Sequence, residues 1–380
     1  RCLQCKDAPC SQSCPVNVKI PDFLAKIVEG KLLSAADTIL QDNFLPAICG
    51  RVCPQEELCE SHCVLAKKGK SVAIGNLERY TADATTQMRS DRAEVISASP
   101  TGKKVALVGS GPSSLACAGD LIRMGHSVTV YEALHAFGGV LVYGIPEFRL
   151  PKTIVEYEVN ALQNLGVKFE KNVVIGQTLS LDDLLHDYAY DAVFIGAGAG
   201  LPNFLGIPGE ELVGIYSANE LLTRINLMKA YKEESITPVF SYRDKVVTVF
   251  GAGNTALDSA RTALRMGAKE VYIIYRRTEA EMPARREEVI HAKEEGVQFI
   301  FLASPLEFSG DADGWLQKVK LQRMELGEPD ASGRRRPLPI AGSEFEMDIQ
   351  MAVIAIGNGS NPLLRDTLNL VFTKRHTLQV

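Results

Sequence analysis

Eight of the nine cysteines lie within residues 2–63 of this 380-residue chain. They form two groups of four, and each group contains a Cys-Pro pair: Cys2, Cys5, Cys10 and Cys14, then Cys49, Cys53, Cys59 and Cys63. Such crowding without secretory features favours metal or cluster ligation over disulfides. Iron–sulfur clusters use thiolates in this way, and the last cysteine of a run often binds the other cluster. Zinc is the alternative, because cysteine pairs also suit a tetrahedral site.

A dinucleotide-binding fingerprint follows the cysteines. Val105–Val108 is an apolar run typical of a strand, and after the glycine turn an apolar stripe has helical spacing. A second strand over Ser127–Tyr131 ends at Glu132, about twenty residues after the glycines. Gly109 allows the tight turn, Gly111 lets backbone approach a pyrophosphate at the helix N-terminus, and Glu132 is placed to accept from ribose hydroxyls.

One position departs from this pattern. Ser114 stands where a third glycine is usual, so we expect the helix and the strand to lie slightly farther apart. The fingerprint is of the type that binds a flavin dinucleotide, and this also bears on the cysteines. An electron carrier beside a flavin would have a use, whereas a structural zinc site would not. The fingerprint therefore favours iron–sulfur clusters over zinc.

The segments after the fingerprint offer further contacts for the same cofactor. The glycine pair at 138–139 permits close approach to a flat ring system, and Arg149 is either a polar contact or a surface ion-pair residue. A strand over 167–174 places Val174 against the adenine. A buried strand over 191–199 ends in small residues that include Gly198, which brings backbone beside a bound cofactor.

The same plan repeats from Val246. A strand, the glycines Gly251 and Gly253, a helix and a second strand follow one another. In place of the acid, the second strand ends in Arg276 and Arg277. An arginine pair can bind a 2′-phosphate through bidentate hydrogen bonds, whereas an acid would repel it. This difference favours NADP(H) over NAD(H); the alternative is a plain basic surface.

The strand over 348–357 matches the strand over 191–198, because each begins with an acid and ends in glycine. Two fingerprints, each followed by such a strand, predict two dinucleotide domains in one chain. Arg285 and Arg286 are either assisting cations or solvated side chains. The arginine run at 334–336 is expected at a solvated hairpin tip, with an RNA or partner patch as the alternative.

The composition describes a globular chain. Hydrophobic residues make up 46% of the sequence, and the mean hydropathy is near zero. The longest apolar runs, such as Met351–Ile356, are far shorter than a membrane span, and no signal peptide is visible. The net charge of −5 gives no electrostatic footprint for nucleic acid. We therefore expect a cytoplasmic protein with no membrane or nucleic-acid partner.

Several stretches together resemble one family. They are CLQCKDAPCSQSCP, CGRVCPQEELCESHC, GSGPSSLACAGDL, GGVLVYGIPEFRLPK, GAGAGLPNFLGIPGE with YSANELLTRINLMKAY, and YRRTEAEMPAR. Over essentially its whole length the chain is similar to the NADPH-dependent glutamate synthase small-chain (beta-chain) family. This family also includes the ferredoxin:NADP oxidoreductase large subunit, a sulfide dehydrogenase subunit and the N-terminal half of dihydropyrimidine dehydrogenase.

The resemblance implies two [4Fe–4S] clusters with crossed ligands. One set would be Cys2, Cys5, Cys10 and Cys63, and the other would be Cys14, Cys53, Cys59 and Glu78. Some relatives use an oxygen ligand at the position of Glu78. Spacing alone nominates Cys49, which stays the alternative fourth ligand, and Glu78 by itself would be expected as an exposed helix residue. His62 is expected to be a bystander.

The resemblance further implies FAD on the first fingerprint and NADP(H) on the second. The expected FAD contacts are Gly109, Gly111, Pro112, Ser113, Glu132, Gly139, Leu141, Arg149 and Val174. The expected NADP(H) contacts are Gly251, Gly253, Asn254, Thr255, Arg276 and Arg277. Gly198 and Gly357, at the ends of the two acid-led strands, complete the set of expected cofactor contacts.

These observations predict an α/β protein with a helical N-terminal double-cluster domain over 1–95 and two Rossmann-like domains of the pyridine nucleotide-disulfide oxidoreductase type. The NADP(H)-binding domain, 206–345, would be inserted in the FAD-binding domain, 100–205 plus 346–380, and the polar stretch 90–102 would be a linker. Family members continue past 357 with further FAD contacts. The C-terminal part of the FAD domain is therefore expected to be truncated, in a fragment clipped at both ends.

The implied function is electron transfer, in which NADPH reduces FAD and the clusters carry electrons to a large or second redox subunit. The first assignment is the small chain of glutamate synthase, which forms glutamate from 2-oxoglutarate and glutamine. The alternatives are an NADH-dependent bifurcating ferredoxin:NADP oxidoreductase, with ferredoxin as partner, and a sulfide dehydrogenase subunit. A different class is a zinc- and nucleotide-binding module without redox chemistry. No catalytic acid or base is expected.

Overall fold

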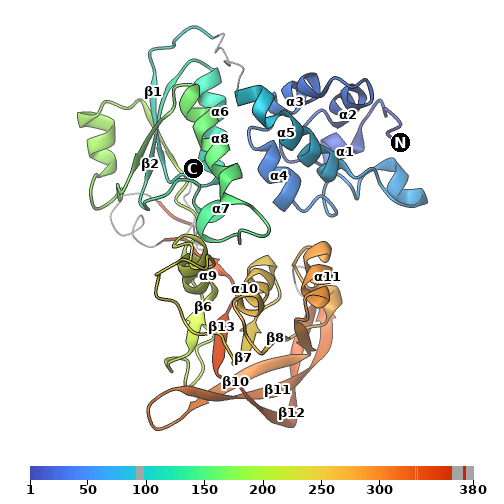
Figure 1. Ribbon diagram of the computed structural model, residues 1–380, viewed down its shortest axis with the longest axis vertical. Helices are drawn as coiled ribbons and strands as arrows, with labels where there is room; N and C mark the ends of the chain where they lie inside the picture. Colours follow the sequence, from blue (N-terminus) through green and yellow to red (C-terminus); the bar gives the residue numbers. More distant parts are fainter. Residues whose placement is uncertain (91–97, 330, 332, 362–370, 374–380) are drawn as a thin grey trace. The chain divides into compact units, whose positions relative to one another are not determined.

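The computed structural model describes residues 1–90, 98–329, 331, 333–361 and 371–373 (Figure 1). Its contacts divide the chain into two compact units: unit 1 is Arg1–Val142, Glu147–Gly198 and Asn361–Val380, and unit 2 is Tyr143–Pro146 and Ala199–Ser360. Part of the expected linker and part of the expected C-terminal FAD segment lie outside the described residues. Among the helices that are described, none combines the length and the apolar character needed to cross a membrane.

The cysteines belong to a helical domain in unit 1. Its helices are α1 (Pro9–Gln12), α2 (Ile20–Val28), α3 (Leu32–Leu40), α4 (Pro46–Val52), the 3₁₀ turn η1 (Val64–Lys68) and α5 (Ile74–Ser90). Pro21 stands in the first turn of α2, where no intrahelical N–H is needed. Ile20, Phe23 and Leu24 share one face of α2 and pack in one core with Ile39 of α3. The helical character predicted for the N-terminal domain is thus confirmed.

The first dinucleotide fold, also in unit 1, is a parallel sheet in the order β3-β2-β1-β4. Its elements are β1 (Lys104–Val108), α6 (Pro112–Arg123), β2 (Ser127–Glu132), α7 (Val140–Tyr143), α8 (Lys152–Asn164), β3 (Lys168–Lys171), the π-type turn η2 (Asp183–Asp187) and β4 (Ala192–Ile195). The strand expected over 167–174 is shorter, because β3 ends at Lys171. Val174 lies in the turn that follows, where its carbonyl accepts from the Gln177 and Thr178 N–H groups.

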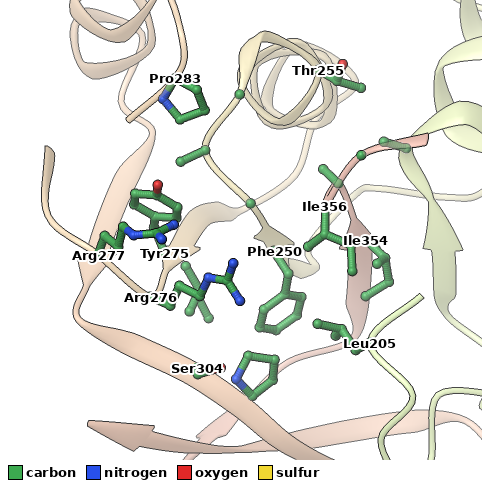
Figure 2. Close-up of a pocket in the computed structure, with 18 of the residues that line it drawn as sticks. Leu205, Phe250, Thr255, Tyr275, Arg276, Arg277, Pro283, Ser304, Ile354 and Ile356 are labelled. Atoms are coloured by element: carbon green, nitrogen blue, oxygen red, sulfur yellow. The ribbon is translucent and has the colours of Figure 1, made fainter. Parts of the chain in front are cut away.

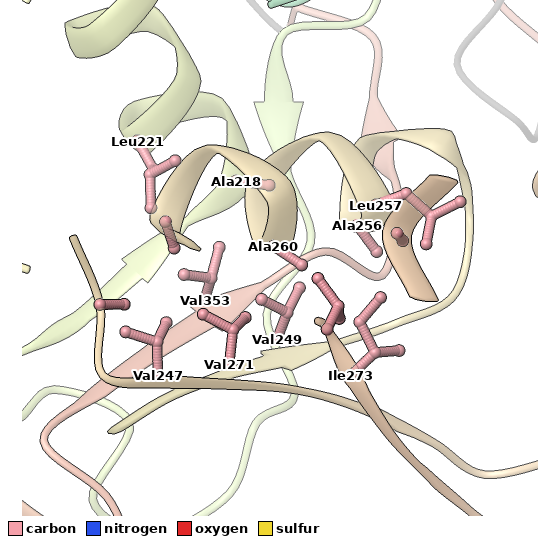
Figure 3. Close-up of a cluster of buried hydrophobic side chains, with 14 of the residues drawn as sticks. Ala218, Leu221, Val247, Val249, Ala256, Leu257, Ala260, Val271, Ile273 and Val353 are labelled. Atoms are coloured by element: carbon pink, nitrogen blue, oxygen red, sulfur yellow. The ribbon is translucent and has the colours of Figure 1, made fainter. Parts of the chain in front are cut away.

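Unit 2 contains a second parallel sheet, in the order β6-β13-β7-β8-β9. Its elements are β6 (Ile215–Ser217), α9 (Ala218–Asn226), β7 (Val246–Phe250), α10 (Asn254–Arg265), β8 (Glu270–Tyr275), the 3₁₀ turn η3 (Glu279–Glu281), α11 (Arg286–Glu294), β9 (Gln298–Phe301) and β13 (Met351–Ile354). Figure 3 shows how Ala256 and Ala260 of α10 face Val249 of β7. Small residues on α10 let the helix lie close to the sheet.

The predicted internal repeat is confirmed by strand order. The acid-led strand β4 lies beside β1, and its counterpart β13 lies beside β7. This pairing corrects one predicted boundary. Residues from 346 onward were assigned to the FAD domain, but β13 is hydrogen-bonded between β6 and β7, and unit 2 extends to Ser360.

A separate antiparallel sheet in unit 2 connects β9 to β13. It consists of β10 (Ala303–Gly310), β11 (Leu316–Pro329) and β12 (Arg335–Asp348). The hairpin predicted at the arginine run is the β11–β12 turn. Near the ends of unit 2, β5 (Leu201–Pro202) pairs with β14 (Asn358–Gly359), so the segments that enter and leave this unit run side by side.

Within unit 1, the fingerprint helix α6 contacts the cysteine-bearing domain. A Cβ added to Gly119 would stand 2.4 Å from the ring of Phe44, so only glycine permits this approach. The Arg123 guanidinium lies 3.9 Å from the centre of the same ring and donates a hydrogen bond to the Leu40 carbonyl. The helix that begins at the predicted FAD pyrophosphate site therefore rests directly on the domain that carries the cysteines.

Candidate cofactor sites

The first fingerprint builds an anion-binding helix end. Gly109 has φ +90°, and a Cβ there would lie 2.6 Å from the Gly196 carbonyl oxygen at the end of β4. A Cβ on Gly111 would meet nothing within 4 Å, so the first turn of α6 is open to a ligand. Pro112 occupies the first helical position, and the free N–H groups that follow suit a pyrophosphate. The site fits the dinucleotide that the sequence predicts.

Glu132 is buried and organises this turn. Its Oε2 accepts from the Ser110 N–H at 2.9 Å and from the Ser110 hydroxyl at 2.5 Å, while Oε1 accepts from the Leu134 N–H at 2.9 Å. The Ser110 hydroxyl also accepts from the Gly138 N–H at 2.9 Å. The acid expected to bind ribose therefore also ties the glycine turn to the segment that contains Gly139. The sequence did not single out Ser110, which has the middle place in this network.

The other expected FAD contacts are placed less uniformly. A Cβ on Gly139 would lie 2.9 Å from the Gly111 Cα, so these two glycines pack backbone to backbone. Leu141 is buried in α7, and its carbonyl accepts from the buried Lys152 ammonium at 3.0 Å. Ser113 lies next to Gly196, as its hydroxyl is 3.2 Å from a Cβ placed there. Arg149 and Val174 are half-buried, and Gly198 is exposed.

In unit 2 the second fingerprint lines a cavity of about 540 Å³. Five of the six expected NADP(H) contacts line it together with Gly357, another expected cofactor contact: Gly251, Gly253, Thr255, Arg276 and Arg277. Figure 2 shows the arginines on one side of the cavity and Ile354 and Ile356 on the other. Gly251 has φ +132°, and a Cβ there would stand 2.2 Å from the Ala355 carbonyl. The cavity opens at the N-terminus of α10, where a pyrophosphate fits.

The basic side chains around this cavity differ in their environment. Arg276 is exposed, whereas Arg277 is buried and its Nε donates to the Arg335 carbonyl at 2.7 Å. Arg285 is buried, pairs with Glu287 at 3.1 Å and lies outside the lining of the cavity, as does the exposed Arg286. Asn254 also lies outside the lining.

The carbonyl oxygen of the Asn254 side chain accepts from the Arg285 N–H at 3.0 Å, so Asn254 holds the start of α11. The expected cofactor role of Asn254 is therefore joined by a structural one. This second role could not be read from the fingerprint, because it depends on a residue thirty-one positions further along the chain.

Several of the cysteines lie near one another in the helical domain, where Cys10, Cys59, Cys2, Cys14 and Cys63 share one buried cluster. Burial raises the pKa of the Cys10 thiol, and the nearby Cys63 and Cys2 raise it further. Burial likewise raises the pKa of Cys59, with smaller contributions from Cys53 and Cys14. Within the described residues, no three His, Cys, Asp or Glu side chains converge as one metal ion requires. A [4Fe–4S] cluster binds each thiolate through a different iron, so its ligands stand farther apart.

Glu78 lies beside the second group and is not an exposed helix residue. It is 9% exposed, and burial raises its pKa to about 7 despite a hydrogen bond from Asn43 that acts in the opposite direction. Asn43 Nδ2 donates to Glu78 Oε1 at 2.9 Å, and the Cys49 thiol lies 3.7 Å from Asn43 Oδ1. Burial and then Glu78 raise the pKa of Cys49. Glu78 and Cys49, the two candidates for the fourth ligand of the second cluster, thus both lie beside Asn43.

Comparison with known proteins agrees with these sites. Residues 1–90 match the family described as dihydropyrimidine dehydrogenase domain II, 4Fe-4S cluster, and residues 103–380 match pyridine nucleotide-disulphide oxidoreductase. The glutamate synthase [NADPH] small chain of Escherichia coli (strain K12) is 41% identical over 94% of this chain and 75% of its own length. The chain belongs to the glutamate synthase small-chain family.

As a member of this family, the chain is an NADPH-dependent oxidoreductase that uses FAD and iron–sulfur clusters. The family match at residues 1–90 sets the zinc alternative aside. The NADP(+)-dependent formate dehydrogenase subunit beta of Moorella thermoacetica is 36% identical over 98% of the chain, which spans 54% of that relative. FprA of Mycobacterium tuberculosis in complex with NADPH shares the fold, with a TM-score of 0.59 and 23% identity over 71% of this chain and 73% of its own.

Proposed function

We propose that this chain is the NADPH-oxidising small chain of a glutamate synthase. It would deliver electrons to a large subunit that converts 2-oxoglutarate and glutamine reductively to glutamate. The proposal is supported by 38–41% identity to small chains from three organisms. The observation that carries it is the combination, in one chain, of two cysteine groups, an acid-ended fingerprint and a cavity with an exposed arginine.

The residues of the chain have distinct tasks in this proposal. The N–H groups at the start of α10 bind the pyrophosphate of NADPH, and Arg276 binds its 2′-phosphate. The corresponding end of α6 binds the pyrophosphate of FAD, with Glu132 as the ribose acceptor. When bound, FAD supplies hydride chemistry and the [4Fe–4S] clusters supply one-electron transfer. The chain positions these groups and shields them from water, and no side chain needs to act as acid or base.

The proposed cluster ligands are those of the two cysteine groups. One cluster takes Cys2, Cys5, Cys10 and Cys63, and the other takes Cys14, Cys53, Cys59 and Glu78, with Cys49 as the alternative to Glu78. The proposed domains are a cluster domain over 1–95, an FAD domain from residue 100 and an NADP(H) domain from 206 that includes β13. A cytoplasmic location accords with this proposal, because free thiolate ligands persist in a reducing compartment.

The proposal is tested with the natural full-length protein, co-expressed with a glutamate synthase large subunit and purified without air. We expect NADPH oxidation that depends on both 2-oxoglutarate and glutamine and yields glutamate, with NADH as the control nucleotide. Ferredoxin-coupled NADH turnover without glutamate formation would contradict the proposal. That result would instead support the ferredoxin:NADP oxidoreductase alternative.

A further inference from the structure

The arginine run at the β11–β12 turn is not uniformly a solvated hairpin tip. Arg334 is half-buried and lines the 540 Å³ cavity together with Arg276, although 58 residues separate these two positions in the chain. Arg336, two positions further on, does not line this cavity. It lines a neighbouring cavity of about 670 Å³ together with Arg276, Arg277 and Leu338.

Hydrogen bonds from arginine side chains to backbone carbonyls hold the turn in this place. Arg277 Nε donates to the Arg335 carbonyl at 2.7 Å, and the Arg277 side chain is 5% exposed. Arg335 folds back along the hairpin, where its Nη2 donates to the Leu326 carbonyl at 2.7 Å and its Nε to the Gly327 carbonyl at 3.3 Å. Arg277 thus anchors the first residue of β12, and the anchored backbone presents Arg334 at the cavity.

We propose that Arg334 supplies the second guanidinium for the 2′-phosphate of NADP(H), beside Arg276, and that Arg277 is a positioning residue. The inference rests on the proposed use of NADP(H). A phosphate monoester carries close to two negative charges and three acceptor oxygens, which one guanidinium fork cannot match alone. Adjacent sequence positions imply that Arg276 and Arg277 form the pair. The proposed pair instead combines Arg276, which directly follows β8, with Arg334 of the β11–β12 turn.

The antiparallel sheet acquires a function through this assignment. Its strands belong to neither parallel sheet, and the β11–β12 hairpin is long enough to bring its turn to the nucleotide cavity. The preference for NADP(H) over NAD(H) then depends on an inserted element as well as on the fingerprint. A change confined to this hairpin can alter nucleotide preference while the fingerprint stays the same.

The test measures the dissociation constants of NADP⁺ and NAD⁺ for the cofactor-loaded protein by isothermal titration calorimetry. The variant is Arg334→Gln, and the comparison variant is Arg336→Gln, which removes the same charge from the same hairpin but lines only the neighbouring cavity that it shares with Arg276 and Arg277. The ligands 2′,5′-ADP and 5′-AMP serve as a second pair that reports on the phosphate alone. Arg277→Gln tests the positioning role.

We expect Arg334→Gln to weaken NADP⁺ and 2′,5′-ADP about tenfold, the usual effect of removing a hydrogen bond to a charged group, without changing NAD⁺ or 5′-AMP. Arg336→Gln should change neither pair by more than about twofold. Arg277→Gln should lower NADP⁺ affinity, and combining it with Arg334→Gln should add little, because both act through one side chain.

Several results would overturn the inference. An Arg334→Gln variant with unchanged NADP⁺ affinity, or with equal losses for NADP⁺ and NAD⁺, would show that Arg334 does not read the 2′-phosphate. A loss of NADP⁺ affinity in Arg336→Gln as large as that in Arg334→Gln would show that the 2′-phosphate is not read specifically by Arg334, because Arg336 shares the neighbouring cavity with Arg276. The wild-type protein distinguishes a failure of this inference from a failure of the proposed nucleotide preference. If it binds NAD⁺ as tightly as NADP⁺, the proposed preference is wrong and this inference is wrong with it. If it prefers NADP⁺, the variants test this inference alone.

Discussion

Asn43 lies beside both Glu78 and Cys49, the two candidates for the fourth ligand of the second cluster. Its side-chain amide donates to Glu78, and its side-chain carbonyl accepts from the Leu45 N–H at 3.0 Å and lies near the Cys49 thiol. The bond to Oε1 orients the Glu78 carboxylate and leaves its Oε2 for another partner. Such an orienting contact is what a metal-ligating carboxylate commonly has. This geometry favours Glu78 over Cys49 as the fourth ligand.

Single substitutions distinguish the two ligands. We expect Cys49→Ser to retain the full iron and acid-labile sulfide content of the reconstituted chain, because the thiol is not needed. Glu78→Ala should lose the iron of one cluster and keep that of the other. Metal analysis and electron paramagnetic resonance of the reduced protein measure both outcomes. Loss of a cluster in Cys49→Ser, with an intact pair in Glu78→Ala, would assign the thiolate instead.

At this scale the sequence predicted residue types better than residue environments. The fingerprint glycines and Arg276 were predicted from spacing, since their roles follow from local backbone geometry. The network of Ser110, the burial of Arg277 and the bridge made by Asn43 were not predicted. Each depends on a partner from another element, and a linear pattern does not contain that partner.

The third glycine that is missing from α6 is matched by Gly196, which directly follows β4. A Cβ on Gly196 would stand 2.2 Å from the Ser114 hydroxyl, which is buried and makes no hydrogen bond. The equivalent positions of the second fold are Ala256 and Ala355, one small side chain on each element. In the first fold the helix carries a serine and the strand end a glycine, whereas in the second fold each carries an alanine. The side-chain volume between helix and strand is thus divided differently in the two folds. Whether Ser114 also increases the distance from α6 to β1 stays a prediction.

Because Ser114 and Gly196 fit against each other, a substitution at one should be compensated by a substitution at the other. We expect Gly196→Ala to destabilise the protein by about 1–3 kcal/mol through overpacking, and to lower FAD retention, because β4 ends at the fingerprint. Adding Ser114→Gly should restore most of both. The matched control is Gly200→Ala, since a Cβ at Gly200 meets nothing within 4 Å. Thermal unfolding and bound flavin absorbance provide the measurements, and equal losses in the single and double variants would refute the pairing.

At the scale of the whole molecule, the repeated βαβ plan could be predicted, but one domain boundary could not. Both dinucleotide folds and the insertion of the second in the first follow from the order of the motifs. The boundary at 346 was wrong because an acid-led strand has the same pattern in either fold. Only its hydrogen bonds to β6 and β7 show that β13 completes the second sheet.

This correction can be tested by excision. We expect a fragment spanning 199–360 to fold cooperatively and bind 2′,5′-ADP, because it contains every strand of its sheet. A fragment spanning 206–345 should fail to fold, since the loss of β13 leaves β6 and β7 without the strand between them. Circular dichroism with thermal melting and calorimetric titration measure both fragments. Folding and binding by the shorter fragment would restore the original boundary.

The pairing of β5 with β14 means that the sequence of unit 2 can be circularly permuted. Leu201 and Gly359 are partners in this pair, so the two chain ends of the unit stand beside each other. A short peptide could therefore join them, and new termini could be opened in the turn between β10 and β11. Such a circular permutant would keep every strand neighbour of the native unit while starting and ending on a different loop.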